Sequence, residues 1–411
     1  MSCVILQIGQ CGNQVGQQFW SLVDNSLIRH GYSTDDADNC FTLTNPSNNQ
    51  RYYRSINIDT ENKVINSLFA NNNKFLKFNF RPCNVITEKC GRGNNWAMGY
   101  YQGRLSHRDD IFERTMQEMR KEVERGETFK GCAIFHSVSG GTGSGVSSRL
   151  VELIRDEYAK ECLISFAVTP FENGDTPLQD YNSLLALSKI HFHSDAVVLI
   201  SMISNNKPAS ATTSTFNDLN KMIAECIAGL TFPINDYENN YLNEIMLEKI
   251  AKTFNTDYAN KFVSCNSTSQ QFKNWGDGVE TLLNQLETFN KNENATQENF
   301  KLKQLLMIGR GNLQLNKEPL TKSFINKILT NYFQSRRSTM PISLLQSEGS
   351  STSLTMAFQS NISKIYLEKI FKNSLEKFAV GAYVHWYERY EATVEDFHSA
   401  FKYIQNLLSY M

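Results

Sequence analysis

The stretch GGTGSG (140–145) contains four glycines, and a turn of this composition could hold an anion. It directly follows the apolar run CAIFHSV (132–138) and precedes a helical pattern. A glycine-rich turn lets backbone N–H groups approach a phosphate, and the N-terminus of the next helix adds the positive end of its dipole. No lysine follows the last glycine, so the stretch is not a Walker A loop. The sequence predicts phosphate binding by backbone groups.

A second candidate for chemistry is the acidic pair Asp59 and Glu61 in SINIDTEN (55–62). Two oxygen ligands on one turn suit a hard cation that keeps several of its waters. An isolated D-x-E pair is more often a solvated turn, so this pair gains meaning only beside other motifs. His191 and His193 do not indicate a metal site, because a two-residue spacing on a helix points them to different faces. No Ser–His–acid or cysteine nucleophile signature appears.

The amino-acid composition excludes several classes of protein. The 411 residues include 41 Lys plus Arg and 42 Asp plus Glu, so no basic field would attract a nucleic acid. The nine cysteines are scattered without a CxxC pair, which favours reduced thiols in the cytosol. No signal-peptide pattern begins the chain, and no apolar run reaches the roughly 18 residues that span a bilayer. We expect a soluble cytosolic protein with no nucleic-acid or membrane partner.

The elements that must position these motifs alternate between strand and helix. The predicted strands are 3–8, 55–59, 132–138, 163–169 and 195–202. Such alternation indicates an α/β fold with a parallel sheet covered on both faces, in which ligands bind at the carboxyl ends of the strands. The glycine turns all fall at such ends, so we expect them to share one edge of the sheet.

After about residue 205 the alternation weakens. Residues 214–230 predict one long buried helix with Phe216 on its apolar side. The Asn-rich stretch 290–301 is interpreted as a surface loop. Apolar residues at three- and four-residue spacing predict helical segments over 362–390 and 393–411. Their aromatic residues are interpreted as packing, and the outer face of the helices is a candidate surface for partner proteins.

Four ordered signatures carry a family resemblance: GQCGNQVG (9–16), GRGNNWAMGYY (91–101), GGTGSG (140–145) and HWYERYE (385–391). In this order and spacing they resemble the tubulin superfamily. GNNWAMGY, QDYNSLLALSKIHFHSDAVVL and the lack of a glutamate-rich tail are most similar to delta-tubulin. The resemblance implies a tubulin-like α/β fold in four parts: a parallel-sheet nucleotide-binding domain (1–205), a core helix (206–231), a second α/β domain (232–361) and a C-terminal helical hairpin (362–411).

The resemblance also implies a pocket for GTP or GDP with magnesium. Asp59 and Glu61 match the acidic turn that faces the magnesium, partly through water, and the terminal phosphate. Phe216 matches the aromatic residue that stacks on the base, and Asn220 matches the residue that reads its guanine edge. Without the resemblance, these two would be interpreted as a core and a surface residue. The residues that match the phosphate, sugar and base loops are Gly9, Gln10, Cys11, Gln14, Gly93, Asn94, Ser137, Gly140, Gly141, Thr142, Gly143, Asp175, Gln179, Phe216 and Asn220.

Four positions depart from the family pattern. Ser139 stands where glycine is more common, and a serine there is strained if the backbone is left-handed. Arg92 occupies a position that is usually small, and we expect it to point to solvent rather than to add a cation near the terminal phosphate. Gln179 replaces a glutamate, although an amide still bonds a ribose hydroxyl. Met202 replaces a second base-reading asparagine, which predicts weaker guanine specificity.

Catalysis in this family is completed when the next subunit places an acidic loop on the terminal phosphate, where a carboxylate positions the attacking water. The matching region is NNYLNEIMLEKIAK (239–252). Its candidates are Glu244 and Glu248, acting in trans as a slow assembly-dependent GTPase or not at all. The alternative is that both are exposed glutamates on a helix, so the resemblance leaves enzymatic activity open.

The implied partners are other tubulins through longitudinal contacts, or further copies of this chain. The missing acidic tail implies little tail-dependent binding of motors. We expect a place in the cytoplasm and cytoskeleton, and at centrioles or basal bodies with triplet microtubules if the delta resemblance holds. The alternative functions are a nucleotide-locked structural, templating or capping subunit and a dinucleotide-dependent enzyme. No GxGxxG with the expected acidic residue supports the latter.

Overall fold

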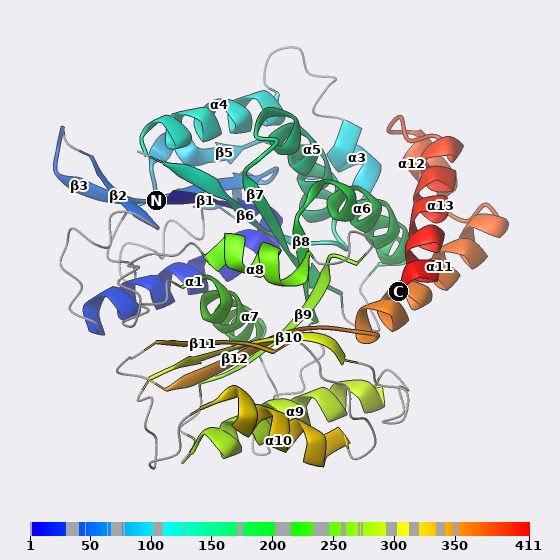
Figure 1. The fold of residues 1–411 in the computed structure, drawn as a ribbon. Helices are drawn as coiled ribbons and strands as arrows, with labels where there is room; N and C mark the ends of the chain where they lie inside the picture. Colours follow the sequence, from blue (N-terminus) through cyan, green and yellow to red (C-terminus); the bar gives the residue numbers. More distant parts are fainter. Residues whose placement is uncertain are drawn as a thin grey trace.

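The computed structural model describes residues 2–29, 41–45, 47–63, 65–66, 76, 79–101, 110–126, 128–170, 176–201, 215–232, 246–255, 260–269, 272, 274–292, 302–311, 320–333, 342–347 and 352–411 (Figure 1). In these ranges, no helix combines the length and the apolar character needed to cross a bilayer. Helices pack on both sides of one large twisted sheet (Figure 1).

Within the described residues, ten strands form one sheet. Their order is β11 (Ile342–Ser347), β10 (Leu302–Arg310), β12 (Ser353–Ser360), β9 (Phe262–Thr268), β8 (Ala196–Ser201), β7 (Cys162–Thr169), β6 (Phe129–Ser137), β1 (Ser2–Ile8), β4 (Ser55–Asp59) and β5 (Val85–Thr87). All neighbours from β9 to β5 pair in parallel. β12 pairs antiparallel with β9 and β10, while β10 and β11 are parallel. The predicted α/β fold with a parallel sheet is confirmed.

Helices cover both faces of the parallel strands, so adjacent strand residues enter different cores. Ile5 of β1 packs with α1 (Gly9–Arg29), α7 (Phe216–Thr231) and α8 (Met246–Phe254). Its neighbour Leu6 packs with α4 (Ile111–Glu124), α5 (Ser147–Glu157) and α6 (Gln179–His193). Burial on both sides explains why these strands are almost continuously apolar in the sequence.

The remaining strands carry their own covering helices. β2 (Thr42–Asn45) and β3 (Gln50–Tyr53) form a separate hairpin. α9 (Trp275–Asn292) and α10 (Lys322–Phe333) pack on the side of β10 and β12 that faces away from α7, and form a third apolar core (Figure 1). Because α9 continues to Asn292, the first residues of the predicted loop 290–301 are helical, and 293–301 lie outside the described residues.

The C-terminal helices pack against α6. The predicted helical segment 362–390 is interrupted: α11 (Ile362–Ala379) ends before a turn, and α12 (Val384–Glu388) begins after it. The backbone causes the break, because Gly381 and Tyr383 have φ values of 67° and 62°. α13 (Val394–Tyr410) matches the second predicted segment, and a capping box between Thr393 and Asp396 fixes its start.

Candidate functional site

The turns after β1, β4, β5 and β6 meet at the carboxyl edge of the parallel sheet. A methyl group on Gly9 would lie 3.1 Å from the backbone nitrogen of Gly143, and the φ of Gly9 is 74°. The hydroxyl oxygens of Thr60 and Thr142 are 2.6 Å apart. A methyl group on Gly141 would collide with the carbonyl oxygen of Arg92. Segments far apart in the sequence therefore form one continuous site.

The glycine loop leads into a helix through an unusual turn. Residues Thr142–Val146 form a π-helical turn that continues into α5, and such turns often lie at functional sites. Ser139 is not among the described residues with positive φ, so it causes no left-handed strain. Its backbone N–H donates to the Ser137 hydroxyl at 3.2 Å. The serine at this position is therefore compatible with a regular entrance to the loop.

The side chain of His136, in β6, forms a hydrogen bond to the glycine loop. Its Nδ1 is 3.0 Å from the carbonyl oxygen of Gly143, and its Nε2 is 2.7 Å from the Ser165 hydroxyl. A carbonyl only accepts, so Nδ1 carries the proton and Nε2 accepts from Ser165. Burial lowers the pKa of His136 from 6.5 to about 4. The neutral imidazole therefore supports the loop and adds no charge to the site.

The acidic turn contains a buried carboxylate that can accept a further ligand or hydrogen bond. Asp59 is 3% exposed, and one of its oxygens accepts from the Glu61 backbone N–H at 3.3 Å. Its other oxygen, Oδ2, has no hydrogen-bond partner among the described residues. Burial raises the Asp59 pKa to about 6, partly offset by backbone N–H groups. Such an unsatisfied buried oxygen needs a partner, which a cation would supply.

Asp59 and Glu61 suit Mg²⁺ better than a metal ion whose ligands are all protein side chains. The described part of the chain holds no group of three or more His, Cys, Asp and Glu side chains suited to a metal. Mg²⁺ is typically bound through one or two carboxylates, with waters and substrate phosphates as the other ligands. Asp59 and the exposed Glu61 form such a pair beside the glycine loop.

Arg92 does not point to solvent, contrary to prediction. It is 6% exposed and forms an ion pair with Glu88. Its guanidinium also donates to the carbonyl oxygen of Cys90 at 3.1 Å. The cation is paired on its own loop, because burying a guanidinium requires a compensating partner.

The first and seventh helices meet at the base-binding end that the family pattern predicts. The Asn220 amide donates to the Gln14 side chain at 3.3 Å, which joins two predicted site residues 206 positions apart. Phe216 is 67% exposed at the first turn of α7 and is not part of the apolar face predicted for it. Burial raises the Cys11 pKa to about 12, so a neutral thiol lies on α1 between Gln10 and Gln14.

Part of the predicted site lies outside the described residues. These positions are Asp175, Met202 and Glu244. Gln179 is described and is the half-buried first residue of α6.

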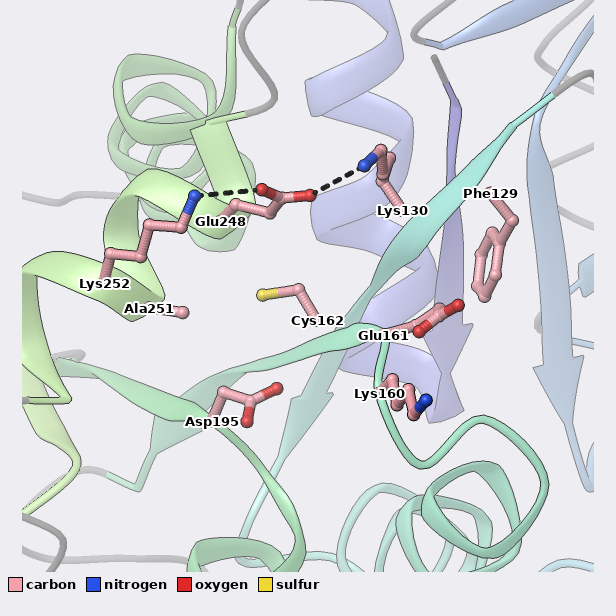
Figure 2. Close-up of a pocket in the computed structure, with 9 residues that line it drawn as sticks. All are labelled: Phe129, Lys130, Lys160, Glu161, Cys162, Asp195, Glu248, Ala251 and Lys252. Carbon is pink, nitrogen blue, oxygen red and sulfur yellow. Dashed lines mark hydrogen bonds and ion pairs between the residues drawn. The ribbon is translucent and has the colours of Figure 1, made fainter.

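Glu248 lies at the opposite edge of the sheet, in a pocket of about 360 Å³ (Figure 2). Its carboxylate is 3.5 Å from Lys130 and 3.2 Å from Lys252. Lys130 is the second residue of β6, and the glycine loop follows the end of β6 at Ser137. At about 3.3 Å per residue, the strand from Lys130 to Ser137 spans about 23 Å, so Glu248 and the glycine loop of its own subunit lie at opposite ends of β6.

Several residues that hold the loops of the site in place have no role predicted from the sequence. Asn13 donates to the carbonyl oxygens of Gly9 at 2.9 Å and Ile58 at 3.0 Å, and so joins the ends of β1 and β4. Asn13 and Thr60 are adjacent to predicted residues, which is the only signal in the sequence for them. Asn182 joins two loops from α6, and no local pattern marks it.

A comparison with protein families matches the first half of the chain. The Tubulin/FtsZ family, GTPase domain, matches residues 2–207. The matched half of the chain contains β1 to β8 and the described turns after β1, β4, β5 and β6. Phe216, Asn220 and Glu248 lie beyond the match.

Proposed function

Because this chain belongs to the Tubulin/FtsZ family, we propose that it binds a guanine nucleotide with Mg²⁺ at the glycine loops, and that a second subunit completes the site for hydrolysis. The observation that carries the proposal is the arrangement around Thr142. The phosphate loop is hydrogen-bonded to Thr60, and the neighbouring Asp59 keeps a buried carboxylate oxygen that has no partner in the described part of the chain.

Each part of the site has a proposed role. The backbone N–H groups of 140–143 and the Thr142 hydroxyl bind phosphate, and Gly93 and Asn94 approach the terminal phosphate from the side. Gln10, Cys11 and Gln14 contact phosphate, sugar or base from α1. Asn220 reads the guanine edge, oriented by Gln14, and the exposed ring of Phe216 stacks on the base. Asp175 and Gln179 bind the ribose.

Asp59 and Glu61 would hold the magnesium, partly through water. When bound, Mg²⁺ neutralises charge on the terminal phosphates. Asp59 is desolvated and Glu61 is exposed, so Asp59 supplies the stronger field and Glu61 reaches water. Thr60 fixes the distance between this turn and Thr142.

The geometry favours hydrolysis in trans. Glu248 lies at the amino edge of the sheet, at the opposite end of β6 from its own glycine loop. A head-to-tail contact brings that edge of one subunit onto the carboxyl edge of the next. There the carboxylate of Glu248, or of Glu244, would orient the attacking water.

The setting proposed for this activity follows the delta-tubulin resemblance. The chain would join microtubule-based structures, at centrioles or basal bodies with triplet microtubules, through longitudinal contacts with other tubulins or with itself. Residues 1–205 would bind nucleotide, 206–231 form the core helix, 232–361 the second domain and 362–411 the partner-facing helices.

One observation favours a second function, a nucleotide-locked structural or capping subunit. Glu248 already forms ion pairs with Lys130 and Lys252 of its own subunit (Figure 2). A carboxylate held by two lysines is less available to orient a water molecule for attack. In that case GTP stabilises the fold by binding the native state alone and is not hydrolysed.

The test is to purify the chain, extract its nucleotide and identify it by chromatography. Retained GDP, with phosphate release per subunit that rises with protein concentration, would support turnover across a contact. Retained GTP that persists would support the structural subunit. A site that stays empty after addition of GTP and magnesium would refute both.

A further inference from the structure

A buried carboxamide connects the two loops that face the proposed terminal phosphate. Asn182 lies in the first turn of α6 and is fully buried. Its Nδ2 donates to the carbonyl oxygens of Asn94 and Ser139, each at 2.7 Å. Asn94 belongs to the turn after β5, and Ser139 begins the glycine loop after β6. One side chain therefore sets the separation of both loops.

The orientation of this carboxamide is fixed by its partners. Its Oδ1 accepts from the Trp96 backbone N–H at 2.9 Å and from the Tyr387 hydroxyl at 2.7 Å. All four hydrogen-bonding positions of Asn182 are used, and a flipped amide would place donors against the Trp96 N–H. The turn needs this support, because Asn94 has a left-handed φ of 50°, a conformation that residues other than glycine adopt infrequently.

Tyr387 links this carboxamide to the C-terminal helices. It lies on α12, is fully buried, and points its hydroxyl at Asn182. Burial raises the Tyr387 pKa well above its usual value, so the phenol keeps its one proton for donation. The alternative acceptor, the Leu178 carbonyl oxygen, is farther away at 3.3 Å.

A second contact joins the same helix to the same turn. The side-chain amide of Asn95, next to Asn94, donates to the carbonyl oxygen of Trp386 at 3.0 Å. The Trp386 side chain is 52% exposed on the outer surface of α12. Movement of the 93–95 turn would therefore be transmitted to an exposed aromatic residue.

We propose that Asn182 is a positioning residue of the nucleotide site, oriented by Tyr387, and that this pair couples the terminal phosphate to the exposed face of α12. The inference rests on the proposed function of the loops. A triphosphate that fills the space between the loops fixes their separation, and Asn182 carries that separation to Tyr387. A diphosphate leaves the 93–94 turn without a ligand, and the coupling is released.

Tyr181 offers a matched control. Its hydroxyl also joins α6 to the C-terminal helices, donating to the Ala382 carbonyl oxygen at 3.1 Å, but it contacts neither Asn94 nor Ser139 through this bond. Tyr387→Phe and Tyr181→Phe each remove one hydroxyl between the same elements. Only the first removes a donor from Asn182.

The experiment titrates the full chain, with magnesium, against fluorescent GTP and GDP analogues. Tyr387→Phe should weaken triphosphate binding by about 5- to 30-fold, the effect of one or two kcal/mol, and diphosphate binding much less. Tyr181→Phe should keep the wild-type ratio of the two affinities. Equal loss for both analogues, or an equal loss in Tyr181→Phe, would overturn the inference. Wild-type protein that binds neither analogue would instead refute the proposed function, and the inference with it.

A measurement on the wild-type chain decides the matter if Tyr387→Phe does not fold. The other three tryptophans, Trp20, Trp96 and Trp275, are at most 1% exposed, so acrylamide quenching reports Trp386. Trp386→Phe identifies its share of the signal. Quenching should differ between the GTP-analogue and GDP-loaded states. Identical quenching in two loaded states would show that the loops and α12 are not coupled.

Discussion

Thr60 and Thr142 share a hydrogen bond of 2.6 Å between their hydroxyl groups. Thr60 follows the last residue of β4, and Thr142 begins the π-helical turn after β6. The bond joins the proposed magnesium turn to the proposed phosphate loop. The spacing of the two proposed sites is therefore built into the fold.

Thr60→Val should uncouple the two loops. The substitution keeps the shape but removes a buried hydroxyl, so the free energy of unfolding should fall by about 1 kcal/mol in urea titrations. Nucleotide affinity with magnesium should fall as well. Thr115→Val removes a comparable buried hydroxyl that, among the described residues, bonds only within α4, and it should lower stability without changing nucleotide affinity. Equal nucleotide affinity in both variants would contradict the coupling.

Asp59→Asn should raise the stability of the nucleotide-free chain but remove the effect of magnesium on nucleotide binding. Asp59 has a raised pKa of about 6 and is ionised at pH 7, so the native state without ligand carries an unfavourable buried charge. Removing that charge should raise the unfolding free energy of the nucleotide-free chain by roughly 1–3 kcal/mol. Thermal melts should also show that magnesium no longer adds to the stabilisation by GTP. Asp156→Asn, at an exposed position of α5, is the control, and a nucleotide-free Asp59→Asn chain less stable than wild type would contradict the prediction.

Adjacent glycines of the loop should respond differently to alanine. A methyl group on Gly141 would overlap the Arg92 carbonyl oxygen, whereas on Gly140 its nearest neighbour would be the Asn94 side chain at 3.8 Å. In the absence of nucleotide, Gly141→Ala should lose about 1–3 kcal/mol of stability by overpacking. Gly140→Ala should melt like the wild type. Equal melting temperatures for both variants would show that the two loops do not pack as described.

The first half of the fold follows from local sequence, and the second half depends on distant contacts. The predicted strand 163–169 matches β7, because burial on both faces leaves a continuous apolar run. β9, with the sequence FVSCNST, carries no such run and is defined by antiparallel pairing with β12. The spacing of apolar residues also does not predict the break after α11, since Tyr383 has a left-handed backbone that its residue type does not indicate.

The same division applies to the site. Glycine and acidic motifs identify the loops that meet, because parallel strands bring their carboxyl ends to one edge. Partners set by packing are not visible in the motifs. Arg92 is paired with Glu88 rather than solvated, and the contact of Asn182 with Tyr387 spans 205 positions.

His136 predicts a pH dependence of stability. Its pKa is about 4 in the native state against 6.5 when unperturbed, so between these values only the unfolded chain takes up the proton. Stability therefore rises with pH across this window, by roughly 3 kcal/mol from this residue, and is fully present above pH 6.5. Urea titrations at several pH values should show a shallower rise in His136→Gln. An unchanged slope in that variant would contradict the assignment, although His191 adds a rise in the same direction.

Hydrolysis completed in trans can be tested by mixing two defective variants. Glu248→Gln keeps the nucleotide loops but lacks the carboxylate, and Asp59→Asn keeps Glu248 but lacks one of the two proposed magnesium ligands. The first change should preserve the fold, because its ion pairs with Lys130 and Lys252 are partly exposed and such pairs contribute about 0–1 kcal/mol. Each variant alone should release phosphate about a hundredfold more slowly than wild type, the usual contribution of a general base.

In the mixture, contacts form in which Glu248 of one subunit meets the intact loops of the other. Phosphate release should then exceed the sum of the separate rates and should rise with concentration. Lys252→Gln frees Glu248 from one partner and should release phosphate at least as fast as wild type. A mixture no faster than its components would exclude Glu248 as the completing residue. If Glu248→Gln alone equals the wild type, the two lysines hold this side chain in a structural role.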